Sequence, residues 1–315
     1  MQILPAFLWA LPAWFSLNPL LSYFTAVVLL VIGVAIAIKK APPQTDWQEK
    51  IILCGPVFIA APMGVFGLDH YFFPAGVASI IPPWIPFHMF WVYFVGTCLI
   101  LGGISIAFQK YAWLAAGLFG IMLLCFEATM NIPGVVKVGF GKLPNSLLIW
   151  TLCVREFSFS LGALSFAAMH TQNRRTKGTH SVITVARIVL GIALTFFGVL
   201  YFRRPELLPG VPLLQLTPDF IPAHLLWGYL TGVIYVVGGV CLLINQKARL
   251  AATWVGLFVL FGVIFLSVPY MLQYASDINR GLNVPADNLM FCGALLCLAG
   301  SLREKSASPA KSVAG

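Results

Sequence analysis

Three ionisable side chains, Glu127, Arg155 and Glu156, lie inside long apolar runs of the sequence. A charged side chain at mid-membrane costs about 2.5–3.5 kcal/mol on insertion scales unless it is paired or hydrated. Adjacent residues on a helix point about 100° apart, so we do not expect Arg155 and Glu156 to face each other. Glu127, on the preceding run, is the predicted partner of Arg155. The group is either an internal ion pair that ties two helices together, or a cluster that handles protons or binds a ligand.

Two histidines occupy matching positions at the start of two other runs. His88 and His224 each follow a proline by two residues, and Trp91 and Trp227 come one turn later on the same helix face. A neutral imidazole there could hydrogen-bond a quinone carbonyl or ligate haem. Alternatively, these residues belong to an aromatic belt at the membrane interface. Haem has the weaker support, because the sequence has neither a further histidine pair nor a CxxCH motif.

Metal and thiol chemistry find little support in the sequence. Asp69 and His70 form an acid and imidazole pair without a third ligand, and we expect them in the first outer loop as solvent-facing polar residues. No metal site is therefore predicted. All seven cysteines lie in apolar runs and no CxxC motif occurs, which argues against a disulfide framework and against a dithiol redox pair.

The elements that position these residues are membrane spans. Of 315 residues, 60% are hydrophobic and 9% are charged, whereas an ordinary soluble domain has about 25% charged residues. The 19 Lys and Arg exceed the 10 Asp and Glu, but they cluster in short loops between apolar runs, so nucleic acid is not an expected partner. The lipid bilayer is the expected partner, and the predicted fold class is an all-α polytopic integral membrane protein.

Apolar stretches of about 20 residues predict about nine transmembrane helices. Prolines interrupt the opening segment Met1–Asn18, which we expect to lie at the interface with Trp9 and Trp14 at headgroup level. The polar tail, residues 303–315, is expected to be disordered. The predicted spans are Leu20–Ile38, Gln48–Phe66, Phe87–Phe108, Ala112–Met130, Ser146–His170, Ser181–Tyr201, Ile221–Ile244, Leu250–Tyr270 and Asp287–Leu302.

The basic residues predict the orientation of the chain. If the N-terminus lies outside, 13 Lys and Arg fall in cytoplasmic loops and the tail, and 5 fall in outer loops. Cytoplasmic loops carry the excess of basic residues in membrane proteins. We therefore predict an outside N-terminus and a cytoplasmic C-terminus, in a bacterial inner membrane.

An internal repeat organises most of the chain. The segment IPFHMFWVYFVG recurs 136 residues later as IPAHLLWGYLTG, and 15 of 49 residues are identical between 85–133 and 221–269. The same offset relates Gly55 to Gly191 upstream, and downstream the offset becomes 131. Each unit has four spans, so we predict two parallel four-helix bundles related by a pseudo-two-fold axis along the membrane normal. The predicted parts are 1–46 (interfacial segment and extra helix), 47–170 (first repeat), 182–302 (second repeat) and 303–315 (tail).

The two repeats differ in their charged residues. Glu156 aligns with Asp287, but the counterparts of Arg155 and Glu127 in the second repeat are apolar. If only one repeat has a polar cavity, it is therefore expected to be the first.

The two repeats resemble the DoxX-like family of small four-helix membrane proteins. The resemblance rests on Ala186-Arg187, Gly198, YVVGGVCLL and NLMFCGALLCLAG in the second repeat, and on IPPWIP followed by HxxWxYxxG in the first. It covers 47–170 and 182–302. It implies a four-helix bundle for each repeat, and some relatives are associated with quinone-linked oxidation of sulfur compounds or with membrane redox complexes. The tandem fusion and the extra first helix depart from the family pattern.

These patterns lead to one leading functional hypothesis. The chain is expected to be a subunit of a membrane redox assembly that binds a quinone-type ligand, with catalysis performed by a redox partner protein. No catalytic residue is assigned, and whether the chain is an enzyme stays open. The predicted ligand-binding residues are His88, Trp91, Glu127, Arg155, Glu156 and His224.

Two alternatives remain. The first is a carrier for a small hydrophobic or weakly acidic solute, which the parallel repeat favours because such duplications form substrate paths at the repeat interface. Against it, no predicted span is broken at mid-membrane by a Gly/Pro pair, and charges are few. The second is a membrane scaffold in which the charges only hold the helices together.

Overall fold

The computed structural model describes residues 17–139, 145–170, 176–274 and 281–302. The described residues form helices and connecting segments and contain no β-strand. One isolated β-bridge joins Leu207 and Leu216. Nine helical segments among them are long and apolar enough to cross a membrane. The predicted all-α fold class and the number of spans are thereby confirmed. The expectations for Trp9, Trp14 and the tail fall outside the described residues.

The helix bounds agree with the predicted spans to within a few residues at most ends. The fourth and eighth spans are composite, because each contains a short π-helix between two α-helices. The elements are α1 (Leu17–Lys40), α2 (Trp47–Phe72), α3 (Pro74–Ile80), α4 (His88–Ala107), α5 (Ala112–Phe126), η3 (Glu127–Asn131), α6 (Ile132–Val138), α7 (Asn145–His170), α8 (Lys177–Arg203), α9 (His224–Leu243), α10 (Ala248–Gly262), η4 (Val263–Ser267), α11 (Val268–Gln273) and α12 (Asn283–Ser301).

One boundary error matters for the site residues. Helix α2 continues to Phe72, so Asp69 and His70 lie within a helix and not in an outer loop as expected. Asp69 is 9% exposed and His70 is half-buried. The helix continues because no residue after Phe66 interrupts its hydrogen bonds until Pro74, which lacks the N–H needed to extend it.

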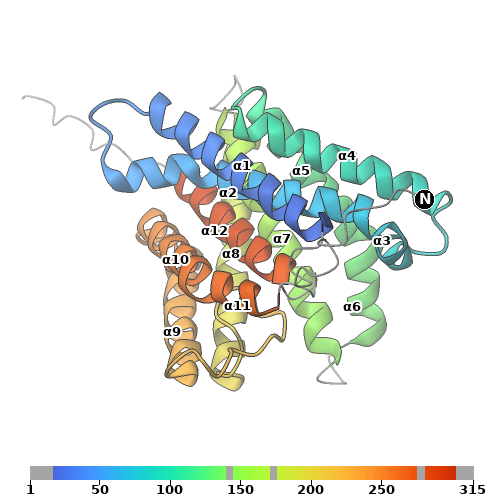
Figure 1. The fold of residues 1–315 in the computed structure, drawn as a ribbon. Coiled ribbons are helices and arrows are strands. Elements are labelled where there is room, and N and C mark those ends of the chain that lie inside the picture. Colours follow the sequence, from blue (N-terminus) through green and yellow to red (C-terminus); the bar gives the residue numbers. More distant parts are fainter. Residues whose placement is uncertain (1–16, 140–144, 171–175, 275–280, 303–315) are drawn as a thin grey trace, which may run out of the picture.

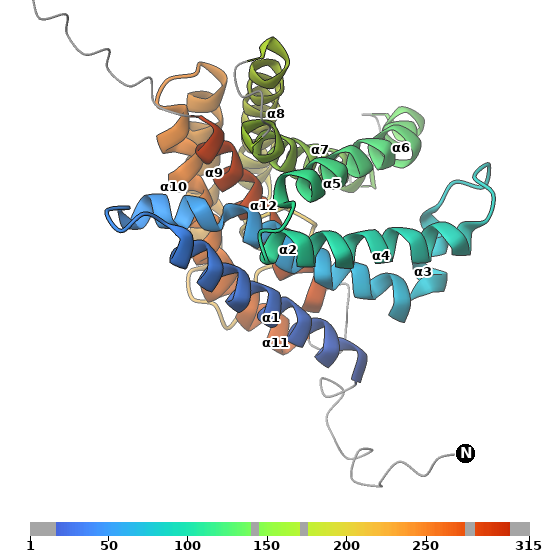
Figure 2. The same ribbon diagram turned by 90° about the horizontal axis from the view of Figure 1, so that it is seen from above.

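Helix α12 lies at the centre of the helical assembly (Figures 1 and 2), where it packs against α2, α7 and α10. In the membrane-spanning part of α12, 89% of the residues are buried, which is more than in any other span of the described residues. Helix α2 packs along α12, and α7 packs along α8. The last helix of each predicted repeat therefore lies against the first helix of the other repeat, so the two units interlock.

Small residues allow these close helix contacts. An ideal Cβ atom at Gly293 of α12 would lie 2.8 Å from the carbonyl oxygen of Gly55 and 2.9 Å from the backbone nitrogen of Ile59. A Cβ atom at Gly162 of α7 would overlap Ala294. Small residues bring helix backbones together in lipid, where packing rather than the hydrophobic effect drives association.

Glycine contacts also relate α2 to α8. A Cβ atom at Gly96 would lie 3.0 Å from the carbonyl oxygen of Gly67, and one at Gly232 would lie 3.2 Å from that of Gly198. Gly232 follows Gly96 by 136 residues, but Gly198 follows Gly67 by 131. The packing thus matches α8 to α2 at an offset of 131, and not at the 136 that pairs Gly55 with Gly191. The segment between α8 and α9 is five residues longer than the segment between α2 and α4, which accounts for the difference between the two offsets.

Substitution of Gly293 tests the central packing. Gly293→Ala is expected to destabilise the protein by about 1–3 kcal/mol, because the added methyl group overpacks the α2 and α12 contact. Gly262→Ala is the matched control, since nothing lies within 4 Å of its added Cβ atom. It should be neutral or stabilise by about 0.5–1 kcal/mol. Thermal unfolding in detergent measures both, and equal effects of the two substitutions would contradict the proposed close contact.

Candidate functional site

Arg155 is the centre of a polar cluster between α7 and α12. Its Nη1 donates to Asp287 Oδ2 at 3.0 Å, and its Nη2 donates to Glu156 Oε1 at 2.5 Å. The Asp287 side chain is 2% exposed, and those of Arg155 and Glu156 are 18% and 16% exposed. Two carboxylates from different helices thus share one guanidinium, which presents several donors in a planar fork.

Two expectations about Arg155 are wrong. It contacts its neighbour Glu156, because the long arginine side chain reaches across the angle that separates adjacent residues on the helix. Its partner on another helix is Asp287, not Glu127. The polar cluster is therefore shared between the two repeats and is not confined to the first.

Glu127 is bound by different residues. It is 1% exposed at the start of η3, where Asn131 Nδ2 donates to Oε1 at 2.8 Å and Cys153 Sγ donates to Oε2 at 3.0 Å. Residues two apart on a helix point about 200° apart, so Cys153 and Arg155 lie on opposite sides of α7. Helix α7 consequently contacts η3 through Cys153 and α12 through Arg155.

The fourth and eighth spans each contain a π-helix at matching positions of the repeat. Segment η3 begins at Glu127 and η4 begins at Val263, and each is followed by an α-helix with proline in its first turn. Each span nevertheless remains one continuous helix, over Ala112–Val138 and Ala248–Gln273, so the π-helix is a local change of hydrogen bonding and not a break. The signal was present in the sequence as Pro133 and Pro269, since proline removes a backbone donor and disturbs the preceding turn. Single-turn π-helices often occur at functional sites.

The cluster has more acids than bases. Arg155 is the one cation among its contacts, whereas Glu156, Asp287 and the nearby Glu127 are acids. Several buried atoms have no protein partner, namely Arg155 Nε, Asp287 Oδ1 and Thr151 Oγ1. Buried polar atoms almost always have partners. The cluster can therefore hold water, protons or a polar group of a ligand.

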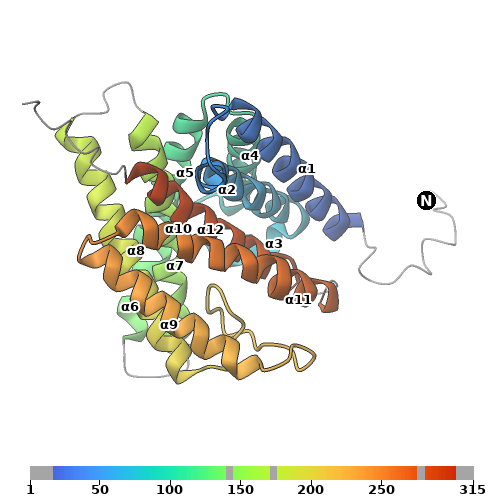
Figure 3. The same ribbon diagram turned by 90° about the vertical axis from the view of Figure 1, so that its left-hand side faces the viewer.

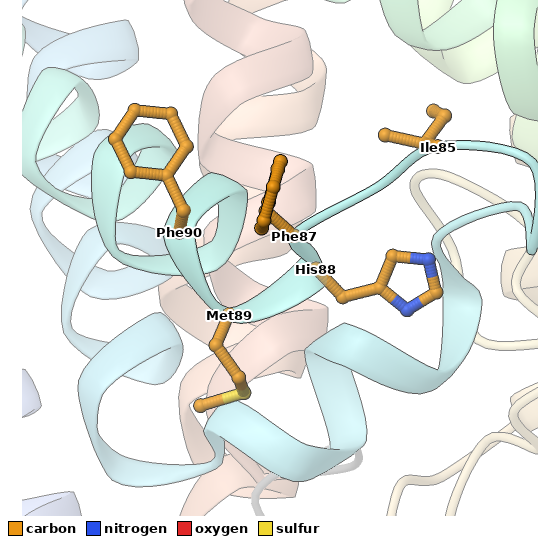
Figure 4. Close-up of a pocket in the computed structure, with 5 residues that line it drawn as sticks. All are labelled: Ile85, Phe87, His88, Met89 and Phe90. Carbon is orange, nitrogen blue, oxygen red and sulfur yellow. The ribbon is translucent and has the colours of Figure 1, made fainter.

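His88 and Trp91 lie in a separate place. His88 Nε2 is 3.2 Å from the carbonyl oxygen of Pro82, and Trp91 Nε1 donates to that of Pro86 at 3.1 Å. His88 lines an open hollow of about 510 Å³ at the start of α4, which Figure 4 shows in close-up. The other lining residues are Ile85, Phe87, Met89 and Phe90, and none belongs to the Arg155 cluster.

His224 begins α9 as His88 begins α4. It is half-buried, and Trp227 on the same helix lies 6.0 Å from the ring centroid of Phe261. The residues before the two histidines, Phe87 and Ala223, both have a positive φ, of 58° and 55°. The local backbone is thus alike at the two positions, but the hydrogen bonds of Arg155 go to Asp287 and Glu156 and to neither histidine.

A buried loop in the second repeat was not foreseen. Residues 207–212, between α8 and α9, are all buried, and Figure 3 shows the loop beside α9. The Gly210 carbonyl accepts from Tyr201 Oη at 3.2 Å and Tyr235 Oη at 3.1 Å. Asn288 of α12 accepts from the Val211 backbone N–H at 2.7 Å and donates to Ser267 of η4 at 2.9 Å. The loop therefore occupies the space next to η4.

Other site residues were missed for identifiable reasons. The predicted span begins at Asp287, whereas α12 begins at Asn283, so Asp287 lies one turn inside the helix, and its alignment with Glu156 is the signal that marks it. Asn131 and Cys153 gave no signal, because neither is charged.

Among the described residues, no group of His, Cys, Asp and Glu could hold a metal ion. Comparison of the chain with protein-family models, curated proteins and solved structures found no match.

The ion pairs of Arg155 can be tested by paired substitutions. Arg155→Met should destabilise the protein by about 3–5 kcal/mol, because it leaves buried carboxylates without a cation. The double variant with Asp287→Asn should recover part of that loss, since it removes one of the uncompensated charges.

Arg204→Met is the control for this experiment. Arg204 pairs with Glu206, and both side chains are more than one third exposed. Loss of an exposed pair costs about 0–1 kcal/mol. Thermal unfolding of the four proteins measures the effects, and an Arg155→Met variant as stable as Arg204→Met would contradict the assignment.

Proposed function

We propose that the chain is an integral membrane carrier that couples protons to the movement of a small, weakly acidic solute. One observation carries the proposal: the partly buried guanidinium of Arg155 is shared by carboxylates of two helices, Glu156 on α7 and Asp287 on α12. These helices come from different repeats. Substrate sites of duplicated transporters lie at such interfaces.

The charges of the trio suggest how coupling would work. With both acids ionised, the trio has one positive and two negative groups and thus a net charge of −1. A proton bound by Asp287 weakens its attraction to Arg155, so the guanidinium can bind the carboxylate of the solute in the same bidentate way. Proton and anion then enter together without changing the net charge of the site, which limits the cost of holding charge in the membrane.

The helices around the cluster support a change of conformation. Glu127 lies in η3 and is bound through Cys153 to the same helix that carries Arg155. A π-helix can revert to an α-helix with a shift of the following residues by about one position. The close contact between Gly162 and Ala294 lies between α7 and α12. Small residues there allow these two helices to slide without a bulky side chain between them.

The proposed setting keeps the remaining expectations from the sequence. We place the chain in a bacterial inner membrane with its N-terminus outside, which the 13 to 5 distribution of basic residues supports. The pseudo-two-fold relation of the repeats is supported by their shared 136-residue offset from the histidines to the π-helices. The DoxX-like relation rests on the residues that carry the resemblance.

Transport in proteoliposomes tests the proposal. Uptake of radiolabelled monocarboxylates of graded hydrophobicity, from lactate to phenyllactate, should increase when the outside is made acidic. Arg155→Gln should lower this uptake about tenfold or more, because it removes the cation that holds the anion. Asp287→Asn should leave uptake that no longer responds to the pH gradient.

Arg204→Gln is the matched control, because Arg204 forms an exposed ion pair with Glu206 and contacts no residue of the Arg155 cluster in that pair. It should transport as the wild type does. If no monocarboxylate enters faster than into protein-free liposomes under a pH gradient, the proposal is wrong.

A second candidate function is the binding of a quinone-type ligand for a redox partner. The hollow at His88 favours it, since aromatic and apolar residues line it and one imidazole offers a hydrogen bond. We expect gently solubilised protein to retain ubiquinone or menaquinone in its lipid extract, and His88→Ala to lower the amount. His180→Ala is the control, because His180 is exposed in the first turn of α8 and belongs to neither site. Protein that holds no quinone, and binds none when it is added, would contradict this candidate.

A further inference from the structure

Asp69 is a buried carboxyl group that the Arg155 cluster does not use. It lies in the last turn of α2, and its Oδ1 atom has no hydrogen-bond partner. None of the ion pairs of the described residues involves it. An ionised carboxylate without a cation is costly in a membrane span. The surroundings of Asp69 must therefore accommodate it in another form.

Helix α1 contributes one polar group to these surroundings. Tyr23 interacts electrostatically with Asp69, and its hydroxyl is buried without a hydrogen-bond partner. Tyr23 packs against a small apolar cluster of Val65, Leu282 and Ala286, in which α2 meets α12. Val65 precedes Asp69 by about one helical turn, so the cluster lies next to the carboxyl group.

Helix α12 contributes a second polar group, as the helix register indicates. Gly55 meets Cys297, with the added Cβ atom 3.0 Å from its backbone nitrogen, and Gly293 meets Ile59 at 2.9 Å. These two contacts define an antiparallel register in which Asp69 comes level with Asn283. The Oδ1 atom of Asn283 is also buried without a partner. Three oxygen atoms without partners thus come from the three helices that meet here.

We infer that Asp69 is a proton-binding carboxyl group, neutral in the folded protein, at the junction of α1, α2 and α12. Carboxylate and amide oxygens only accept hydrogen bonds. A proton on Asp69 makes its carboxyl group a donor to Asn283 Oδ1, either directly or through water. It also removes the charge from the membrane span. The site is separate from the Arg155 cluster and does not depend on the proposed transport.

The neighbouring titratable groups leave this proton in place. On α2, His70 Nδ1 donates to the Phe66 carbonyl at 2.7 Å, and the side chain lies against Gly96 of α4. On α12, Asp287 is held by Arg155. On α4, the backbone carbonyl of Tyr93 accepts from Tyr71. Tyr23 of α1 is neutral in its ordinary state. None of these groups offers Asp69 a fixed positive charge.

A neutral carboxyl group in an apolar site reacts with dicyclohexylcarbodiimide. The carboxyl oxygen bonds to the central carbon of the reagent, and the carboxyl proton moves to one of its nitrogens. The acyl group then migrates from oxygen to the other nitrogen and gives a stable N-acylurea. No group leaves, so the labelled peptide gains the mass of the whole reagent. An ionised carboxylate lacks the proton that the first step needs.

The experiment is carbodiimide labelling of the whole protein in lipid vesicles at neutral pH, with the labelled peptides identified by mass spectrometry. We expect the adduct on Asp69 in the wild type and its loss in Asp69→Asn. Labelling of Asp69 should persist in Asp287→Asn, which separates this site from the Arg155 cluster. Labelling should fall as the pH is raised, because the proton is then lost.

Glu206 is the control residue within the same sample. Its slight burial raises its pKa, but the hydrogen bond from Arg204 prevails and lowers the pKa below its usual value. It is therefore ionised and should stay unlabelled. A wild-type protein in which Asp69 stays unlabelled at neutral and mildly acidic pH overturns the inference. So does an infrared spectrum in which Asp69→Asn removes no protonated carboxyl band.

Discussion

The burial of α12 is the constraint on which the rest of the structure depends. A helix surrounded by α2, α7 and α10 must present small residues to its neighbours and must find partners for every polar side chain. Gly293 and Ala294 meet the first requirement, and Asp287 and Asn288 create the second. Asp287 is bound by Arg155 of α7, and Asn288 is bound by the loop between α8 and α9. The positions of both groups follow from the central helix.

The same constraint explains why the polar groups gather where they do. Asp287 and Asn288 are adjacent on α12, so they point in different directions and organise different neighbours. Asp287 binds Arg155 of α7, which also binds Glu156 of the same helix. Cys153, also on α7, donates to Glu127 in η3. Asn288 donates to Ser267 in η4. Both π-helices are thus connected to the central helix by polar contacts.

The sequence predicted the spans well, because each apolar run has the length that a bilayer requires. It also identified Glu127, Arg155 and Glu156 as unusual. It could not assign their partners, since these depend on which helices cross: Arg155 reaches Asp287, which lies 132 residues away in the sequence. The angle between adjacent helical residues misled the prediction for Glu156, because it ignores the length of the arginine side chain. The burial of residues 207–212 could not be predicted either, because their hydropathy is that of an ordinary apolar loop.

The buried loop of the second repeat has a mechanical consequence. Its Gly210 carbonyl and Val211 amide are satisfied only by side chains of α8, α9 and α12. Any separation of these helices at this end would leave these buried backbone groups without partners, at a cost of about 1–3 kcal/mol for each group. The corresponding connection of the first half, residues 73–87 between α2 and α4, contains no buried residue. The buried loop therefore joins α8, α9 and α12 at one end, and the described residues of the first half contain no counterpart of it.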